Sequence, residues 1–357
     1  MKSKDFNNNV SKKESHEDIN KENNIINYFF MFLTILCYIG TFMLIFSHEN
    51  FWENKKEFIP EGYDLPKLQD FKILLIYFPI ILLIKILFET TLQDFMYKYF
   101  LANKYKVVED QDNFKLGLVY KKKLATSLFK VFYYLFSIIV GHFVIRDLGF
   151  IPLELGGKGD MSFITNMEYP NYLFFEKSNY FNEYYIIGLA FVLTDLVWLL
   201  FLYEVQTDFY LMVLHHSITI SLVVFSYLYN FSQIGIIVFY LHDLTDIFVY
   251  ITRIIINTDY NDVIKITPCV MLLVTYFIYR IYLFGKLIFI IGYYHFIILK
   301  PELNDNEMTI LWTFKIFLLI MHIYWINQII RRFIYYKSSS KIEDVGKIKT
   351  QQKTNNN

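Results

Sequence analysis

Residues 207 to 253 read TDFYLMVLHHSITISLVVFSYLYNFSQIGIIVFYLHDLTDIFVYITR, and this stretch decides the fold. It contains two apolar segments joined by a polar turn near residues 230–233. Each segment has about the 20 residues that a helix needs to cross the hydrocarbon layer of a membrane. Backbone groups cannot stay unpaired in lipid, so the stretch predicts a transmembrane helical hairpin.

Apolar blocks of similar length recur along the chain, which has 357 residues, 55% of them hydrophobic. A soluble core does not need so many long blocks, whereas a membrane protein does. We therefore predict an all-α, polytopic integral membrane protein with about eight transmembrane helices. The blocks run approximately 25–46, 71–92, 126–145, 184–203, 209–229, 234–254, 267–298 and 310–333.

The two ends of the chain differ from these blocks because they are polar and rich in Asn. They have too little apolar content to offset the entropy of ordering, so residues 1–24 and 336–357 are predicted to be disordered cytosolic tails. The first block is longer than the apolar part of a signal peptide and is expected to remain as an anchor. Between the two tails we expect three regions: an extra N-terminal helix at 25–46, a span followed by a basic stretch at 71–125, and a main domain at 126–335.

The distribution of Lys and Arg predicts the orientation. An even number of spans places both termini on one side of the membrane. Cations are frequent in the 93–125 connection and near the C-terminus, and rarer in the 47–70 and 146–183 connections. By the positive-inside rule, both termini are expected in the cytosol and the 146–183 connection in the lumen.

Overall charge and cysteine content exclude several classes of function. The chain has 34 Lys and Arg and 34 Asp and Glu, so its formal net charge is zero and no nucleic-acid partner is expected. Its two cysteines, Cys37 and Cys269, lie in or beside apolar segments. They are too few to indicate a disulfide framework or a zinc site.

Ionisable residues gather on the hairpin. His215 and His216 are on its first helix, and Asp243 and Asp246 are on the second. If the hairpin folds about Phe231, His216 and Asp246 lie at equal distances from the turn, about 22 Å from it. Two imidazoles and two carboxylates are therefore predicted at one depth, in the cytosolic half of the membrane.

Such a cluster has three possible roles: joining helices, binding a metal and catalysis. Polar side chains often join membrane helices by hydrogen bonds, but two histidines facing two carboxylates exceed that need. A metal site is not expected, because adjacent histidines on a helix point about 100° apart. Catalysis is favoured, because carboxylates can fix the tautomer of an imidazole and raise its basicity. Other ionisable residues within apolar blocks are more scattered: Lys85, Glu89, Lys130, His142, Asp195, Arg280, Lys286, His295 and His322.

The hairpin resembles the Lag1 motif of ceramide synthases, within the TLC-domain family of membrane proteins. The matching residues occur in the order of the motif. They are Asp208-Phe209, His215-His216, Thr219, Ser226-Tyr227, Asn230, Gly235, His242-Asp243 and Asp246. Looser similarity extends over about 72–335, and includes Arg280 and His322-x-x-Trp325 near the last span.

This resemblance implies a fold, a reaction and a location. Six of the helices would form a TLC-type bundle or barrel in the endoplasmic reticulum membrane. The reaction would be N-acylation of a sphingoid base, sphinganine or sphingosine, by fatty acyl-CoA, a step of sphingolipid metabolism. Acyl-CoA is a co-substrate, and no metal or organic cofactor is expected. The partners would be these two substrates and membrane lipid, and a homo-oligomer stays open.

The resemblance also implies roles for individual residues. His215 and His216 would be the acyl-transfer pair, and Asp243 and Asp246 would orient them and accept protons. The expected supporting or substrate-binding residues are Asp208, His242, Thr219, Ser226, Tyr227, Asn230 and Arg280. The sequence leaves open whether a histidine acts as general base or forms an acyl-imidazole. It also leaves open a non-catalytic TLC-domain protein that binds or helps to translocate lipid.

Overall fold

The computed structural model describes residues 2–106, 111–146, 148, 153, 159, 174–175, 177–202, 208–293, 296–297 and 306–339. Eight helical stretches in these ranges are long and apolar enough to cross a membrane. This confirms the predicted all-α, polytopic architecture. The spans are Ile26–Asn54, Leu68–Tyr99, Phe114–Ile145, Phe181–Phe201, Phe209–Leu228, Ser232–Ile255, Asp262–Tyr293 and Glu307–Ile334.

Most spans are single α-helices, but two contain π-helical turns. The fourth span ends in a π-helix, and the seventh has one between two α-helices. The longer elements are α1 (Lys2–Asn54), α2 (Leu74–Tyr99), α3 (Gln111–Ile145), α5 (Phe181–Val197), η6 (Trp198–Leu202), α6 (Phe209–Leu228), α7 (Ser232–Ile255), α8 (Asp262–Thr275), η7 (Tyr276–Leu283), α9 (Phe284–Tyr293) and α10 (Asn306–Ser339). Three short 3₁₀ turns complete the described elements: η1 (Lys56–Phe58), η2 (Leu68–Ile73) and η3 (Asn103–Tyr105).

The first and last helices are longer than the apolar blocks predicted for them. α1 begins at Lys2, so its backbone is helical through the segment 2–24 that was expected to be a disordered tail. That segment contains neither Gly nor Pro, so nothing in it stops the helix from extending beyond the apolar part. At the other end, α10 continues to Ser339.

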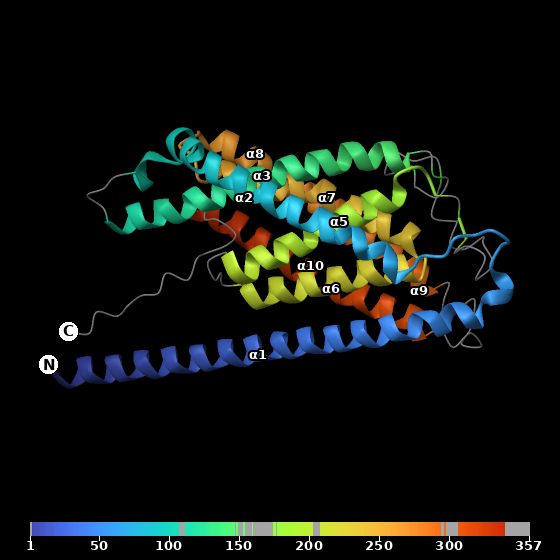
Figure 1. Ribbon diagram of the computed structural model, residues 1–357. Helices are drawn as coiled ribbons and strands as arrows, with labels where there is room; N and C mark the ends of the chain where they lie inside the picture. Colours follow the sequence, from blue (N-terminus) through green and yellow to red (C-terminus); the bar gives the residue numbers. More distant parts are fainter. Residues whose placement is uncertain are drawn as a thin grey trace.

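The spans lie side by side in one bundle, with α1 along its edge (Figure 1). α1 packs on α6, while α7 packs chiefly on α3 and α8. α1 begins and α10 ends at the same end of the bundle, here named the terminal end; the opposite end, where α6 turns into α7, is named the loop end. By the predicted orientation, the terminal end faces the cytosol.

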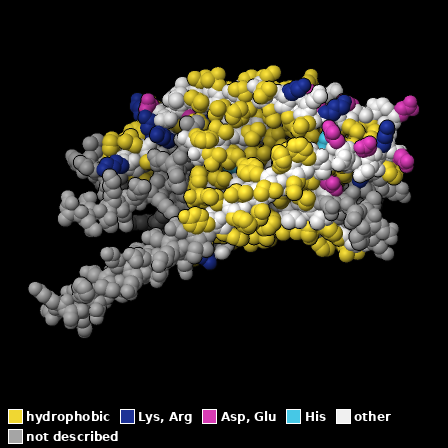
Figure 2. Space-filling view, turned by 60° about the horizontal axis from the view of Figure 1, so that its bottom comes forward, with side chains coloured by type: hydrophobic (Ala, Val, Ile, Leu, Met, Phe, Trp, Pro, Cys, Tyr) yellow, Lys and Arg dark blue, Asp and Glu magenta, His cyan; other side chains and the backbone are white. Residues whose placement is uncertain are grey.

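The outer surface has the pattern expected of a protein that crosses a bilayer. Figure 2 shows a broad band of hydrophobic side chains, with Lys, Arg, Asp and Glu gathered at its two edges. Large apolar side chains of the spans are exposed on the surface, for example Leu75 and Phe201, which are 80% and 76% exposed. A contiguous apolar surface of this kind would be a liability in water but is suited to lipid.

Residues from the first connection close the loop end over the α6–α7 turn. The Trp52 indole donates a hydrogen bond of 3.0 Å to the carbonyl of Leu228. The Tyr227 hydroxyl donates one of 3.0 Å to Asp70, and the Asn230 amide one of 2.7 Å to the Tyr63 hydroxyl. Asn230 has a φ of 57°, a left-handed conformation that Asn tolerates better than most residues. Tyr227 and Asn230 thus serve the turn in this structure.

Gly235 lies where α7 closely approaches Tyr185 of α5 and Ser226 of α6. A Cβ atom added there would lie 2.9 Å from the Ser226 Oγ and closer still to the Tyr185 hydroxyl. We expect Gly235→Ala to lower the free energy of unfolding by about 1–3 kcal/mol through overpacking. Thermal unfolding of the detergent-purified protein measures the effect.

Gly285→Ala is the matched control for this substitution. An added Cβ at Gly285 meets only Leu319 Cδ2, at 4.0 Å. Because Ala also favours helix over Gly, this variant should be as stable as the parent or slightly more so. Equal losses at both glycines would contradict the close-approach argument. Restoration by Tyr185→Phe, which removes the clashing hydroxyl, would support it.

Candidate functional site

A deep cavity lies inside the bundle between α3, α5, α6 and α7, and we name it the central cavity. Its empty volume is about 940 Å³, including the open space at its mouth. The predicted residues that line it are His215, His216, Thr219, Ser226, His242, Asp243, Asp246 and Arg280. The structure therefore brings the four predicted catalytic residues to one cavity.

A second cavity lies nearer the terminal end, and we name it the polar cavity. It is formed by the start of α6 and the end of α7, together with parts of α2, α3 and α5, and its empty volume is about 590 Å³. Asp208, predicted to support the site, lines this cavity rather than the central one. His216 and Asp195 line both cavities, so the wall that separates them runs through these two residues.

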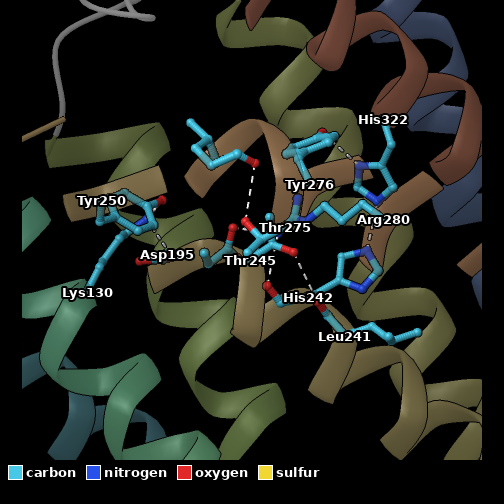
Figure 3. Close-up of polar contacts among 12 residues, drawn as sticks. Lys130, Asp195, Leu241, His242, Thr245, Tyr250, Thr275, Tyr276, Arg280 and His322 are labelled. Atoms are coloured by element: carbon cyan, nitrogen blue, oxygen red, sulfur yellow. Dashed lines mark hydrogen bonds and ion pairs between the residues drawn. The ribbon is translucent and has the colours of Figure 1, made fainter. Parts of the chain in front are cut away.

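Two further histidines form a chain of hydrogen bonds beside the central cavity (Figure 3). His242 Nδ1 donates to the carbonyl of Val238 at 2.7 Å, because a carbonyl can only accept. Its Nε2, when the ring is neutral, accepts from His322 Nε2 at 2.8 Å. His322 Nδ1 then accepts from the Tyr276 hydroxyl at 3.3 Å. This assignment satisfies every ring nitrogen of the chain.

The two carboxylates on α7 have partners that the hairpin alone does not contain. Ser137 on α3 donates a hydrogen bond of 2.6 Å to Asp243. Arg280 in η7 forms an ion pair with Asp246 and also donates to the carbonyl of His242, at 3.3 Å. Within the described ranges, neither carboxylate bonds to a ring of His215 or His216. The expectation that they fix those tautomers is therefore corrected: the helices next to α7 supply their partners.

His215 and His216 differ from the other two histidines because their rings form no hydrogen bond to the residues that the structure describes. The Nδ1 atom of His215 is buried without a hydrogen-bond partner, and its ring packs edge-on against Trp325 with centroids 5.1 Å apart. His216 makes no hydrogen bond to any residue that the structure describes, although its ring lies in the wall between the cavities. An imidazole without a fixed partner can take or give a proton when a substrate arrives.

A buried charge network borders the polar cavity. Asp195 on α5 forms ion pairs with Lys85 of α2 at 2.9 Å and Lys130 of α3 at 2.6 Å. Lys130 also donates a hydrogen bond of 3.0 Å to the Tyr250 hydroxyl (Figure 3). Each of these charged residues stands out in the sequence, but their contacts with one another could not be predicted from it, because they lie on three separate spans. Their opposite signs within apolar blocks were the available signal.

The fold and the site define a class of protein: a helical membrane protein with a cavity that gathers histidines and carboxylates within its spans. The chain belongs to the TLC-domain family, because the model of that family, described as TLC domain, matches residues 123–331. The match includes the whole hairpin and the last span as far as Arg331. The resemblance inferred from the Lag1 motif is thereby confirmed at the level of the family.

Curated relatives match over shorter stretches. Sphingosine N-acyltransferase lag1 of Schizosaccharomyces pombe is 35% identical over 79 residues, 22% of this chain and 19% of the relative. Ceramide synthase 5 of Homo sapiens is 38% identical over 76 residues, 21% of this chain and 19% of the relative. Alternaria stem canker resistance protein 1 of Solanum lycopersicum is 46% identical over 46 residues, 13% and 15% of the two chains. The matched stretches thus span less than a fifth of each relative.

Proposed function

We propose that this protein is a ceramide synthase, an acyltransferase that moves a fatty acyl group from CoA to the amine of a sphingoid base. One observation carries the proposal: His216, whose ring has no hydrogen bond among the described residues, stands in the wall shared by the central and polar cavities. An acyl thioester has a polar half and an apolar half. Its reacting carbon lies where the two halves meet.

The chemistry of the two cavities matches these two halves. The central cavity is lined largely by aromatic and aliphatic side chains, such as Phe191, Leu222 and Phe239, which suit a hydrocarbon chain. The polar cavity holds three cations, Lys85, Lys130 and Arg253, against the carboxylates of Asp195 and Asp208. An excess of positive charge suits the phosphates of CoA. In the predicted orientation this cavity also faces the cytosol, where acyl-CoA is found.

The reaction needs a base because the amine of a sphingoid base is protonated in water. His215 or His216 can take a proton from the amine, whose nitrogen then attacks the thioester carbonyl. Alternatively, one imidazole attacks first, and the amine resolves the acyl-imidazole. On either route a C–N bond to the amine forms and the C–S bond breaks. The protonated amine loses two protons in becoming an amide: one passes by way of an imidazole to the departing thiolate, and the other is released to water. Asp243, which accepts a hydrogen bond from Ser137, and Asp246, which is paired with Arg280, set the local charge around the two imidazole rings.

A groove on the lipid-facing side offers a path for the second substrate. It runs between α2, α3 and α5, and it shares Tyr133, Ser137 and Tyr184 with the central cavity. A sphingoid base dissolved in the membrane would approach along this groove with its chain still in lipid. We further propose that the protein resides in the endoplasmic reticulum membrane, with both termini in the cytosol.

The proposal is tested with membranes that contain the full chain, incubated with sphinganine and a series of acyl-CoAs. We expect mass spectrometry to detect the N-acylated product, formed in proportion to the amount of protein. Membranes from cells without the protein, and from which endogenous ceramide synthase genes have been removed, are the control. A protein that binds lipid without amide formation would instead be the non-catalytic type of TLC-domain protein, and the proposal would fail.

A further inference from the structure

Lys315 on α10 is a charged residue that the reaction above does not use. Its side chain lines the central cavity and is only 4% exposed. No hydrogen bond or ion pair joins its ammonium group to any residue within the described ranges. Leu318, one turn further along α10, and Leu222 of α6 line the same part of the cavity. An isolated amino group thus stands in mainly apolar surroundings.

The depth of Lys315 follows from the histidines. The His322 ring lies 6.1 Å from that of His215 and 4.9 Å from that of His242, so α6, α7 and α10 are level there. Lys315 precedes His322 by seven residues, two helical turns on the same face. At 1.5 Å per residue, its backbone is therefore about 10 Å nearer the loop end than the histidine layer. This places it along the part of the cavity where a lipid chain would extend.

Tyr185, Ser226 and Gly235 also line the central cavity, on the loop-end side of the histidine layer. The hydroxyls of Tyr185 and Ser226 are hydrogen-bonded to each other, and both pack against Gly235. Neither hydroxyl is hydrogen-bonded to Lys315. Ser226 lies ten residues beyond His216 on α6, about 15 Å, so a chain that passes the histidines meets Lys315 before it meets these groups.

The unfavourable free energy of burying Lys315 indicates what kind of group it binds. Lys85 and Lys130 are as deeply buried, but both are compensated by Asp195. Placing a cation in an apolar region without a partner is unfavourable, and charged residues inside membrane spans usually serve a ligand. A saturated hydrocarbon chain would leave the cost in place, whereas a chain with an oxygen atom at this depth would offset it.

We propose that Lys315 binds a hydroxyl group carried along the chain of a lipid, about 10 Å from the histidine layer, so that the central cavity prefers hydroxylated over plain chains. The hydroxyl oxygen accepts a hydrogen bond from the ammonium group. The hydroxylated chain belongs either to the acyl group or to the sphingoid base. Which lipid reacts rests on the proposed function, but the binding preference does not.

Binding is measured first, on the purified full chain in detergent. The probes are the methyl ester of a saturated fatty acid and the same ester with a hydroxyl about 10 Å along its chain from the ester carbon, so that neither carries a free carboxylate. For the parent protein, we expect roughly tenfold or tighter binding of the hydroxylated ester, as for a hydrogen bond to a charged group. Lys315→Met, of similar length and uncharged, should remove that preference. Leu318→Met, in the same cavity, should retain it.

Turnover then distinguishes the two sources of the hydroxyl. An acyl-CoA with a hydroxyl at that distance along its chain is compared with plain acyl-CoA on sphinganine, and a sphingoid base hydroxylated at that distance from its amine is compared with a plain one on plain acyl-CoA. A roughly tenfold preference in kcat/KM, lost in Lys315→Met, is expected for one pair. Equal binding of both esters by the parent protein, or a preference unchanged in Lys315→Met, overturns the inference. Ester discrimination without any amide product supports it while rejecting the proposed acyl transfer.

Discussion

Replacing His216 by Ala is expected to lower sphinganine N-acylation per folded molecule by about 10² to 10⁴, the usual contribution of a general acid–base group. His216 is the residue at which the central and polar cavities meet. Its removal leaves both cavities in place but takes away the ring at the junction. We expect His215→Ala to have a similar effect, because two groups that act as a unit are both needed.

His142→Ala is the control for loss of a histidine from a membrane span. His142 lies on α3 and is exposed on the surface of the bundle, so its removal should leave turnover unchanged. Folded protein is quantified by gel filtration of each variant. Near-normal turnover by His216→Ala would show that this ring is not catalytic. A fall in turnover that only follows the amount of folded protein would indicate a structural role.

The α7 carboxylates should behave differently from the histidines. Asp246→Ala removes the partner of Arg280, which is buried, so we expect loss of folded protein as well as of turnover. Asp243→Ala removes only an acceptor of the Ser137 hydroxyl and should be milder in stability. Turnover must therefore be expressed per folded molecule.

The second large effect is expected at Asp195. Asp195→Asn leaves Lys85 and Lys130 buried without their shared counter-charge, and breaking a buried ion pair from one side costs about 3–5 kcal/mol. We expect a correspondingly large fall in the midpoint of thermal unfolding in detergent. Asp208→Asn is the control, because Asp208 lines the same polar cavity without an ion pair to any described residue.

Replacing all three members of the network separates charge from packing. The triple variant Lys85→Met, Lys130→Met and Asp195→Leu removes both ammonium groups together with the carboxylate that they share. Well-packed apolar residues can replace a buried ion pair with little or no loss, so most of the stability should return. A triple variant as unstable as Asp195→Asn would argue that shape rather than charge balance holds this region. An Asp195→Asn variant as stable as the parent would exclude both explanations.

The spans were predictable because lipid requires long apolar helices, and the hairpin sequence contains two of them. The neighbours of each helix were not predictable in the same way. Lipid tails are as apolar as the side chains, so packing and hydrogen bonds rather than a hydrophobic face decide which helices touch. The common depth predicted for the histidines and carboxylates requires that α6 and α7 face only each other. In the structure, α7 packs mainly on α3 and α8, so Ser137 and Arg280 reach its carboxylates.

The contacts of His322 show that the site, like the helix packing, could not be fully predicted from the sequence. It completes the histidine chain through a hydrogen bond to His242, 80 residues earlier in the sequence. No local spacing connects the two residues. The π-helix η7 adds a second obstacle, because each π turn takes an extra residue and shifts the face on which Arg280 lies. A pattern of 3.6 residues per turn cannot follow such a shift.

The contact between α1 and α6 can form only late in the synthesis of this protein. Thr41 of α1 bonds to Ser221 of α6 at 2.7 Å, 180 residues later in the chain. At about 5–20 residues per second, a ribosome needs roughly 10 to 40 s to synthesise the intervening segment. During that interval the Thr41 hydroxyl can still donate to the carbonyl of Cys37 in its own helix, at 2.7 Å. The first span can therefore sit in the membrane without an unsatisfied hydroxyl until its partner helix has been translated.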